Sequence, residues 1–136
     1  MGHNGLLSYE HSKLQVHGCI QKENVVVSIN PSCKYNFIHL DLTKNLQVST
    51  NNIQSTQVDG LNFQIFKDLK LAMDKYMLHS NLYASDMKNV DVVLGYPWIK
   101  STGIVNINVE NKFLKLWYKK RKSPYRIFLL AQNKGQ

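Results

Sequence analysis

The sequence predicts a single, mostly β domain with one or two short helices. Apolar and polar residues alternate in several short runs, which is the pattern of strands that bury one face. Turn-forming residues separate these runs, most clearly in the Asp59-Gly60 pair. The chain has 136 residues, of which 43% are hydrophobic, and this supplies one compact core. We therefore expect a domain over residues 14–130 between flexible ends at 1–13 and 131–136.

The domain is expected to begin with two antiparallel strands. Alternating apolar residues mark one strand near Leu14–Val16 and a second at Val25–Ile29, with a polar turn between them. Pro31 then ends the second strand, because proline has no N–H to donate to a ladder. The segment Tyr35–Leu46 fits either a short helix or a strand, and we favour a helical turn that ends near Asn45.

The rest of the domain alternates in the same way. Extended structure is expected at Gln47–Ser49 and at Ile53, and Thr56–Asp74 predicts a hairpin around Asp59-Gly60. A further apolar stretch, Tyr76–Leu78, follows. The last predicted elements are a strand at Val90–Leu94, a helical turn at Gly95–Ile99, and two strands at Ile104–Val109 and Phe113–Trp117.

The cellular context is predicted from what the sequence contains and lacks. Cys19 and Cys33 are too few for a disulfide framework, so we expect reduced thiols. The first residues lack the basic start and long apolar stretch of a secretory signal. No apolar run approaches the roughly 20 residues that span a bilayer. We therefore expect an intracellular protein, cytoplasmic or nuclear, without membrane contact.

The formal net charge of +8 is concentrated late in the chain. The densest run, Lys119-Lys120-Arg121-Lys122, can contact the phosphates of a nucleic acid, although a solvated basic segment is the simpler explanation. Aromatic and basic residues interleave just before it, as they do in stacking nucleic-acid binders. We favour a strand there, with Phe113 or Trp117 in the core and the lysines in water.

Other enzyme classes find little support. The histidines are scattered without a metal-binding spacing, so neither a metal site nor a cofactor is expected. They are His3, His11, His17, His39 and His79. Cys33 near His39 is a conceivable nucleophile pair, but a structural thiol is the simpler interpretation. The sequence also lacks a glycine-rich phosphate loop and a G-x-S-x-G motif.

Two segments carry a specific resemblance. Residues 90–103 have the sequence V-D-V-V-L-G-Y-P-W-I-K-S-T-G, an apolar strand that ends in Leu-Gly before a Trp. Residues 29–38 have the sequence I-N-P-S-C-K-Y-N-F-I. Both resemble segments of the retropepsins of gypsy-class retrotransposons, nearest to those of plants, in which the second segment runs roughly I-D-S-G-A-S-x-N-F-I. The two matches bracket residues 14–118.

This resemblance implies an acid-protease barrel and a specific site. It places Val93, Leu94 and Gly95 beneath the active-site loop. It also implies a homodimer in which each subunit contributes one catalytic aspartate. The family's flap hairpin, which clamps an extended peptide, would fall near the remaining candidate binding residues. These are Val58, Asp59, Gly60, Leu61 and Phe63.

The active-site loop departs from the family at three neighbouring positions. Asn30 stands where the resemblance expects aspartate, and its amide cannot exchange the proton that two catalytic carboxyls share. Pro31 replaces a Ser or Thr and lacks its hydroxyl. Ser32 replaces a glycine that permits close backbone approach. The sequence therefore predicts that the chemistry is lost while the flanks of the loop are kept.

No other carboxylate takes the place of the missing aspartate. None of the Asp or Glu residues precedes a Ser/Thr-Gly pair. Asp59-Gly60 comes nearest and is expected to be a turn, and Asp91 is expected to cap or pair structurally. We therefore predict an inactive retropepsin-like domain that dimerises or binds an unidentified protein. The alternatives are a basic nucleic-acid-binding module and residual protease activity with an intact partner that supplies the aspartate.

Overall fold

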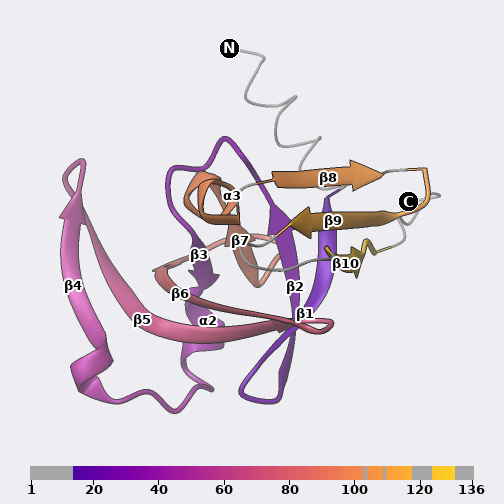
Figure 1. Cartoon of the computed structure of the whole chain (residues 1–136). Coiled ribbons are helices and arrows are strands. Elements are labelled where there is room, and N and C mark those ends of the chain that lie inside the picture. The colour runs from indigo at the N-terminus through magenta and orange to yellow at the C-terminus, as the bar shows by residue number, and fades with distance from the viewer. Residues whose placement is uncertain (1–13, 103, 109, 118–123, 131–136) are drawn as a thin grey trace.

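A computed structural model describes residues 14–102, 104–108, 110–117 and 124–130, and the ends expected to be flexible lie outside the described residues. The described chain forms many short strands and two short α-helices (Figure 1). The mostly β class with short helices is therefore confirmed.

The first hairpin pairs β1 (Gln15–Ile20) with β2 (Glu23–Ile29). Gln21 and Lys22 form a two-residue turn with φ angles of 50° and 73°, which matches the right-handed twist of the two strands. The expected strand pair is thus present, with a first strand that extends further along the chain than its apolar residues indicated.

A six-stranded barrel forms around this hairpin. β7 (Val92–Leu94) lies between β2, to which it is parallel, and β3 (Phe37–His39), to which it is antiparallel. β3 pairs in parallel with β6 (Tyr76–Ser85), and β6 pairs with β5 (Leu61–Met73). A Cys19–Ala72 pairing between β1 and β5 closes the ring.

The β4–β5 hairpin projects from this barrel (Figure 1). β4 (Ile53–Val58) occupies the end of the strand order and pairs with β5 alone among the described strands. The turn at Asp59 and Gly60 has φ angles of 51° and 80°, as the Asp-Gly signal predicted. This projecting hairpin occupies the position in the chain where the resemblance expects a flap.

The helical segments lie after β3 and after β7. α2 (Leu40–Thr43) follows β3 directly, so the segment Tyr35–Leu46 contains both the strand and the helical turn that it was compatible with. α3 (Tyr96–Thr102) begins one residue later than the helical turn predicted at Gly95–Ile99 and extends beyond it. None of the helices in the described part of the chain has the length and apolar character needed to cross a bilayer.

One predicted extended segment forms no strand, although Ser49 in it has an extended backbone. Gln47–Ser49 belongs to no strand, and a short 3₁₀ turn, η1 (Thr50–Asn52), follows it. The physical reason is that the side chain of Gln21 takes the place of a partner strand at Gln47. Gln21 Oε1 accepts a hydrogen bond from Gln47 N at 2.8 Å, and Gln21 Nε2 donates to Gln47 O at 2.9 Å. The N–H and C=O of Gln47 are therefore satisfied without a ladder.

A separate three-stranded sheet contains β8 (Ile104–Asn108), β9 (Phe113–Trp117) and β10 (Tyr125–Phe128), with β9 in the middle. The β8–β9 pair was predicted, although Val109 at its expected end lies outside the described residues, and β10 was not predicted. The expected burial of Phe113 or Trp117 is wrong, because β9 points Leu114 and Leu116 into the core at 0% exposure.

The hydrophobic core fills the barrel and the space between it and the three-stranded sheet. Trp98 of α3 is the largest fully buried side chain, and its Nε1 donates to the Tyr76 hydroxyl at 3.4 Å. Ile29 and Leu94, at the ends of β2 and β7, are also buried. This core anchors the loop that leaves β2.

Candidate functional site

The loop that follows β2 rests on the end of β7. Asn30 N donates to Leu94 O at 2.9 Å, and Tyr96 N donates to Cys33 O at 2.9 Å. Within the loop, Cys33 N donates to Asn30 O at 3.0 Å and closes a turn. Val93 and Leu94 are buried beneath it. The structure therefore brings the Asn30–Cys33 loop and the Val-Leu-Gly segment together, although they are about sixty residues apart in the sequence.

Gly95 is packed against the loop too closely for any side chain. A Cβ at this position would lie 2.6 Å from Cys33 O and 2.7 Å from Tyr35 O, both backbone atoms. Its N–H donates to the buried Asn36 Oδ1 at 2.7 Å, and Asn36 Nδ2 donates to Ser80 Oγ at 3.1 Å. One buried amide thus connects the loop, the strand beneath it and β6.

The side chain of Asn30 is engaged within its own loop. Its Oδ1 accepts from Ser32 N at 2.9 Å and from Ser32 Oγ at 2.7 Å. Its Nδ2 lies 2.9 Å from Cys33 Sγ, to which it donates. Within the described chain, the bonds of this amide go to Ser32 and Cys33 and none to a carboxylate. The arrangement is an Asx turn that positions the loop and offers no group that exchanges a proton near neutral pH.

Cys33 is the loop residue with a shifted pKa. Burial raises the pKa of its thiol, and the hydrogen bond from Asn30 opposes this rise without cancelling it. The thiol therefore stays protonated at neutral pH, which is unfavourable for a nucleophile. Pro31 and Ser32 beside it are exposed. The geometry supports the interpretation of Cys33 as a structural thiol.

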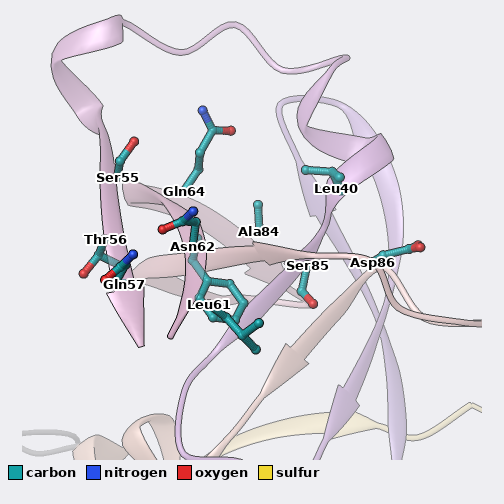
Figure 2. Close-up of a pocket in the computed structure, with 11 residues that line it drawn as sticks. Leu40, Ser55, Thr56, Gln57, Leu61, Asn62, Gln64, Ala84, Ser85 and Asp86 are labelled. Carbon is teal, nitrogen blue, oxygen red and sulfur yellow. The ribbon is translucent and has the colours of Figure 1, made fainter. Parts of the chain in front are cut away.

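A groove of about 840 Å³ runs along the β4–β5 hairpin. Figure 2 shows hairpin side chains on one side of it and side chains from α2 and the end of β6 on the other. Most of the hairpin side chains are polar and uncharged, and Asp86 is the charged member. The lining residues are Leu40, Ser55, Thr56, Gln57, Leu61, Asn62, Phe63, Gln64, Ala84, Ser85 and Asp86.

Two of the five candidate flap residues line this groove. Leu61 and Phe63 do so, and Leu61 is 62% exposed. Val58, Asp59 and Gly60 instead form the end of the hairpin. The polar lining residues were missed by sequence reasoning, although the unbroken polar run at residues 54–57 and the polar residues on either side of Phe63 were a usable signal.

An aromatic cluster lies where the hairpin meets the loop. Phe63 of β5 lies near Phe37 of β3 and Tyr83 of β6, with ring centroids 6.4 and 5.9 Å away. Tyr35 of the loop lies 4.5 Å from Tyr83. These half-buried rings connect the base of the hairpin to the loop, through edge-to-face pairs and tilted pairs. Tyr35 and Tyr83 were not among the predicted site residues.

The remaining predictions concern the basic run, Asp91 and a metal site. Lys119, Lys120, Arg121 and Lys122 lie outside the described residues. Asp91 has the structural role expected for it, because its Oδ2 accepts from Val26 N at 2.8 Å. In the part of the chain that the structure describes, no three His, Cys, Asp or Glu side chains lie close enough to hold a metal ion.

Comparisons with known proteins show the fold. No protein-family model and no curated protein sequence matches the chain. The structure is similar to the retroviral protease-like domain of Ddi1 from Leishmania major, with a TM-score of 0.65 and 12% identity over 89% of this chain and 96% of that one. It is also similar to a retropepsin-like aspartic protease from Rickettsia conorii, with a TM-score of 0.53 and 7% identity over 69% and 75% of the two chains. The architecture is retropepsin-like.

Proposed function

From this retropepsin-like fold, we propose that the chain is a catalytically inactive domain that binds an extended segment of a protein partner along the β4–β5 hairpin. The observation that supports this most is Asn30. It stands where the resemblance expects the catalytic aspartate, and its amide is held by Ser32 and Cys33. The retrotransposon ancestry indicated by the two sequence motifs is part of the same proposal.

Proteolysis by this chain would lack the carboxyl groups that the reaction needs. An aspartic protease needs two carboxyls that share a proton, so that one activates water while the other protonates the substrate. A homodimer of this chain would bring two Asn30 amides together instead. An amide neither accepts nor releases a proton near neutral pH, and the carboxylates at Asp86 and Asp91 belong to the groove wall and to a backbone contact. Cleavage therefore has no general base.

Peptide binding is supported by the free edge of β4 and by the groove beside it. β4 ends the strand order, so one row of its backbone N–H and C=O groups is available for an added strand. Such pairing supplies affinity through main-chain bonds and leaves specificity to side-chain pockets. Ser55, Gln57 and Gln64 add donors and acceptors along the groove.

The lining also favours one class of peptide. The apolar contacts come from Leu40, Leu61, Phe63 and Ala84, and the charged side chain is the carboxylate of Asp86. An acidic peptide would be repelled by this carboxylate, whereas a neutral or basic one would not. We therefore expect an extended segment with an apolar side chain opposite Leu61 and without clustered acidic residues.

Dimerisation is a second part of the proposal and comes from the resemblance. Retropepsins join two subunits through their active-site loops, and Pro31 removes a hydroxyl from that contact. We expect a weak homodimer that dissociates on dilution. Sedimentation over a range of concentrations measures this, and a monomer at every concentration contradicts it without affecting the peptide groove.

Selection from a peptide library tests the binding proposal, with the selected peptide then titrated against three proteins. We expect Leu61→Ala to weaken binding about fivefold or more, because burying a leucine side chain contributes about 1.5–3 kcal/mol. Met77→Ala is the matched control, since Met77 is 51% exposed but lies outside this groove. Amide exchange in β4 should slow when the peptide is added. A wild-type chain that selects no peptide, or equal affinity in Leu61→Ala, would overturn the proposal.

A further inference from the structure

The outer face of the three-stranded sheet exposes aromatic rings. In β9 the side chains of Leu114 and Leu116 enter the core, so Phe113, Lys115 and Trp117 point outward. In β10 Ile127 is buried, so Arg126 and Phe128 point outward with them. Phe128 is 61% exposed and Trp117 is 39% exposed. Large rings at such exposure on one sheet face mark an interaction surface.

The register orders these side chains into rows. Phe128 lies opposite Phe113, and Arg126 lies opposite Lys115. An aromatic pair is therefore followed along the sheet by a cationic pair and then by Trp117. The outer rings are roughly 13 Å apart along β9, because a strand rises about 3.3 Å per residue. Rings at both ends with cations between them form one continuous strip.

The strip carries a net positive charge, since Glu110 in the turn before β9 forms no ion pair with Lys115 or Arg126 in the described chain. The strands of this sheet have the sequences I-V-N-I-N, F-L-K-L-W and Y-R-I-F, which contain no acidic residue. The Arg126 guanidinium lies 4.7 Å from the centre of the Phe113 ring, and Lys115 Nζ lies 6.0 Å from it. In the described chain neither cation forms an ion pair with a carboxylate. The cations stack on a ring and leave their charge facing solvent.

We propose that this strip binds single-stranded nucleic acid, with bases stacked on Trp117 and Phe128 and phosphates held by Lys115 and Arg126. Sequence-tolerant stacking on rings beside a positive surface is how single strands are recognised, and a guanidinium plane such as that of Arg126 can also stack on a base. The exposed amide of Asn106, opposite Lys115, can hydrogen-bond a base edge.

The positive charge of the strip favours a nucleic acid over a second copy of the chain as its ligand. Two copies that met through this face would bring Lys115 and Arg126 of each protomer against those of the other without an acidic partner, which is repulsive. A polyanion gains from the same charges by releasing counterions. The strip also shares no residue with the peptide groove, and Figure 1 shows the hairpin and this sheet on opposite sides of the molecule. The inference therefore holds whether or not the peptide proposal does.

Fluorescence anisotropy with labelled oligo(U) and oligo(dT) of about 12 nucleotides, and with a duplex of the same length, tests this on the full chain. We expect both single strands to bind more tightly than the duplex. Trp117→Ala and Phe128→Ala should each weaken binding at least about fivefold. Met77→Ala is the matched control, since Met77 is 51% exposed and lies on β6, outside both the strip and the peptide groove.

The charge is tested by salt dependence between about 50 and 200 mM. Lys115→Gln with Arg126→Gln should reduce the slope of log affinity against log salt by about 1.4, which is two single-strand phosphate contacts. Lys22→Gln with Lys44→Gln removes the same formal charge from the β1–β2 turn and the end of α2, and should leave the slope nearly unchanged. Quenching of Trp117 on binding gives an independent signal, since Trp98 is 1% exposed.

Three results would overturn the proposal. The first is no binding of either oligonucleotide at low salt. The second is equal loss of affinity in the Lys22/Lys44 and Lys115/Arg126 variants, which would mean that net charge alone is sensed. The third is a wild-type dimer in sedimentation that Trp117→Ala or Phe128→Ala dissociates, which would assign the strip to self-association.

Discussion

The segment beneath the loop and the tip of the hairpin above it differ in almost every physical respect. The loop support, which we define as Asn36, Val93, Leu94 and Gly95, is buried, and its amide and backbone groups are hydrogen-bonded to the loop. The hairpin tip, Val58–Leu61, is exposed and held by one strand pairing. The support therefore fixes shape, while the tip is free to meet a ligand. The loop residues Asn30–Ser32 rest on this buried support, and Pro31 and Ser32 face solvent.

The largest difference in lost stability is expected between alanine substitutions at the two glycines of these regions. Gly95→Ala should lower the free energy of unfolding by about 3 kcal/mol or more, because a Cβ would clash with two backbone carbonyls that cannot move independently. Gly60→Ala has open space around its Cβ and a φ of +80°, so it should cost only about 1 kcal/mol. Urea denaturation measures both. Equal losses would mean that the support is not close-packed.

The buried amide of the support gives the next largest effect. Asn36→Ala should lower the free energy of unfolding by about 2 kcal/mol, since it leaves Gly95 N without its buried acceptor. Asn62→Ala is the control on the hairpin, where the side chain is exposed and the expected change is within about 0.5 kcal/mol. A harmless Asn36→Ala would contradict the role given to this amide.

The fold could be predicted from the sequence only in part. Hairpins with local turn signals, such as β1–β2 and β8–β9, were predicted because alternation and turn residues are contiguous in the chain. β6 was missed because the polar pair Ser80-Asn81 interrupts its alternation, and a bulge between Phe66 and Leu69 shifts the phase of its partner strand. β10 is four residues long with one buried side chain, which is too weak a pattern to detect.

The candidate site was predictable in part for a similar reason. The loop motif and the Val-Leu-Gly segment are each short and contiguous, so each can be recognised in the sequence. The aromatic cluster draws Tyr35, Phe37, Phe63 and Tyr83 from segments that only the parallel pairing of β3 with β6 and the closure of the barrel bring together. The outward direction of Trp117 depended on which face of β9 meets the core, and an alternating apolar strand leaves that choice open.

A smaller effect is expected from the thiol that faces the support. Because folding raises the pKa of Cys33, its contribution to stability is complete below the unfolded thiol pKa of about 8.5 and is lost as the pH rises through the folded pKa. Between the unfolded and the folded pKa of this thiol, the free energy of unfolding of the wild type should therefore fall more steeply with rising pH than that of Cys33→Ser. Parallel pH profiles of the two proteins would contradict this. Cys19 is present in both and cancels.

The smallest effect on stability is expected at the hairpin tip. Leu61→Ala should change the free energy of unfolding by no more than about 0.5 kcal/mol, because the side chain is 62% exposed. Thermal unfolding with and without a selected peptide separates the two roles. The peptide should raise the Tm of the wild type and raise that of the variant less. A large loss of stability without peptide would mean that the tip is structural after all.

The central claim, that the fold is kept while its chemistry is lost at Asn30–Ser32, is tested most directly by peptide-library cleavage between about pH 4 and 7. The wild type should be compared there with the triple variant Asn30→Asp, Pro31→Ser, Ser32→Gly. The account predicts that the wild type cleaves nothing and that the triple variant cleaves. Cleavage by the wild type, abolished by an aspartic-protease inhibitor, would contradict it.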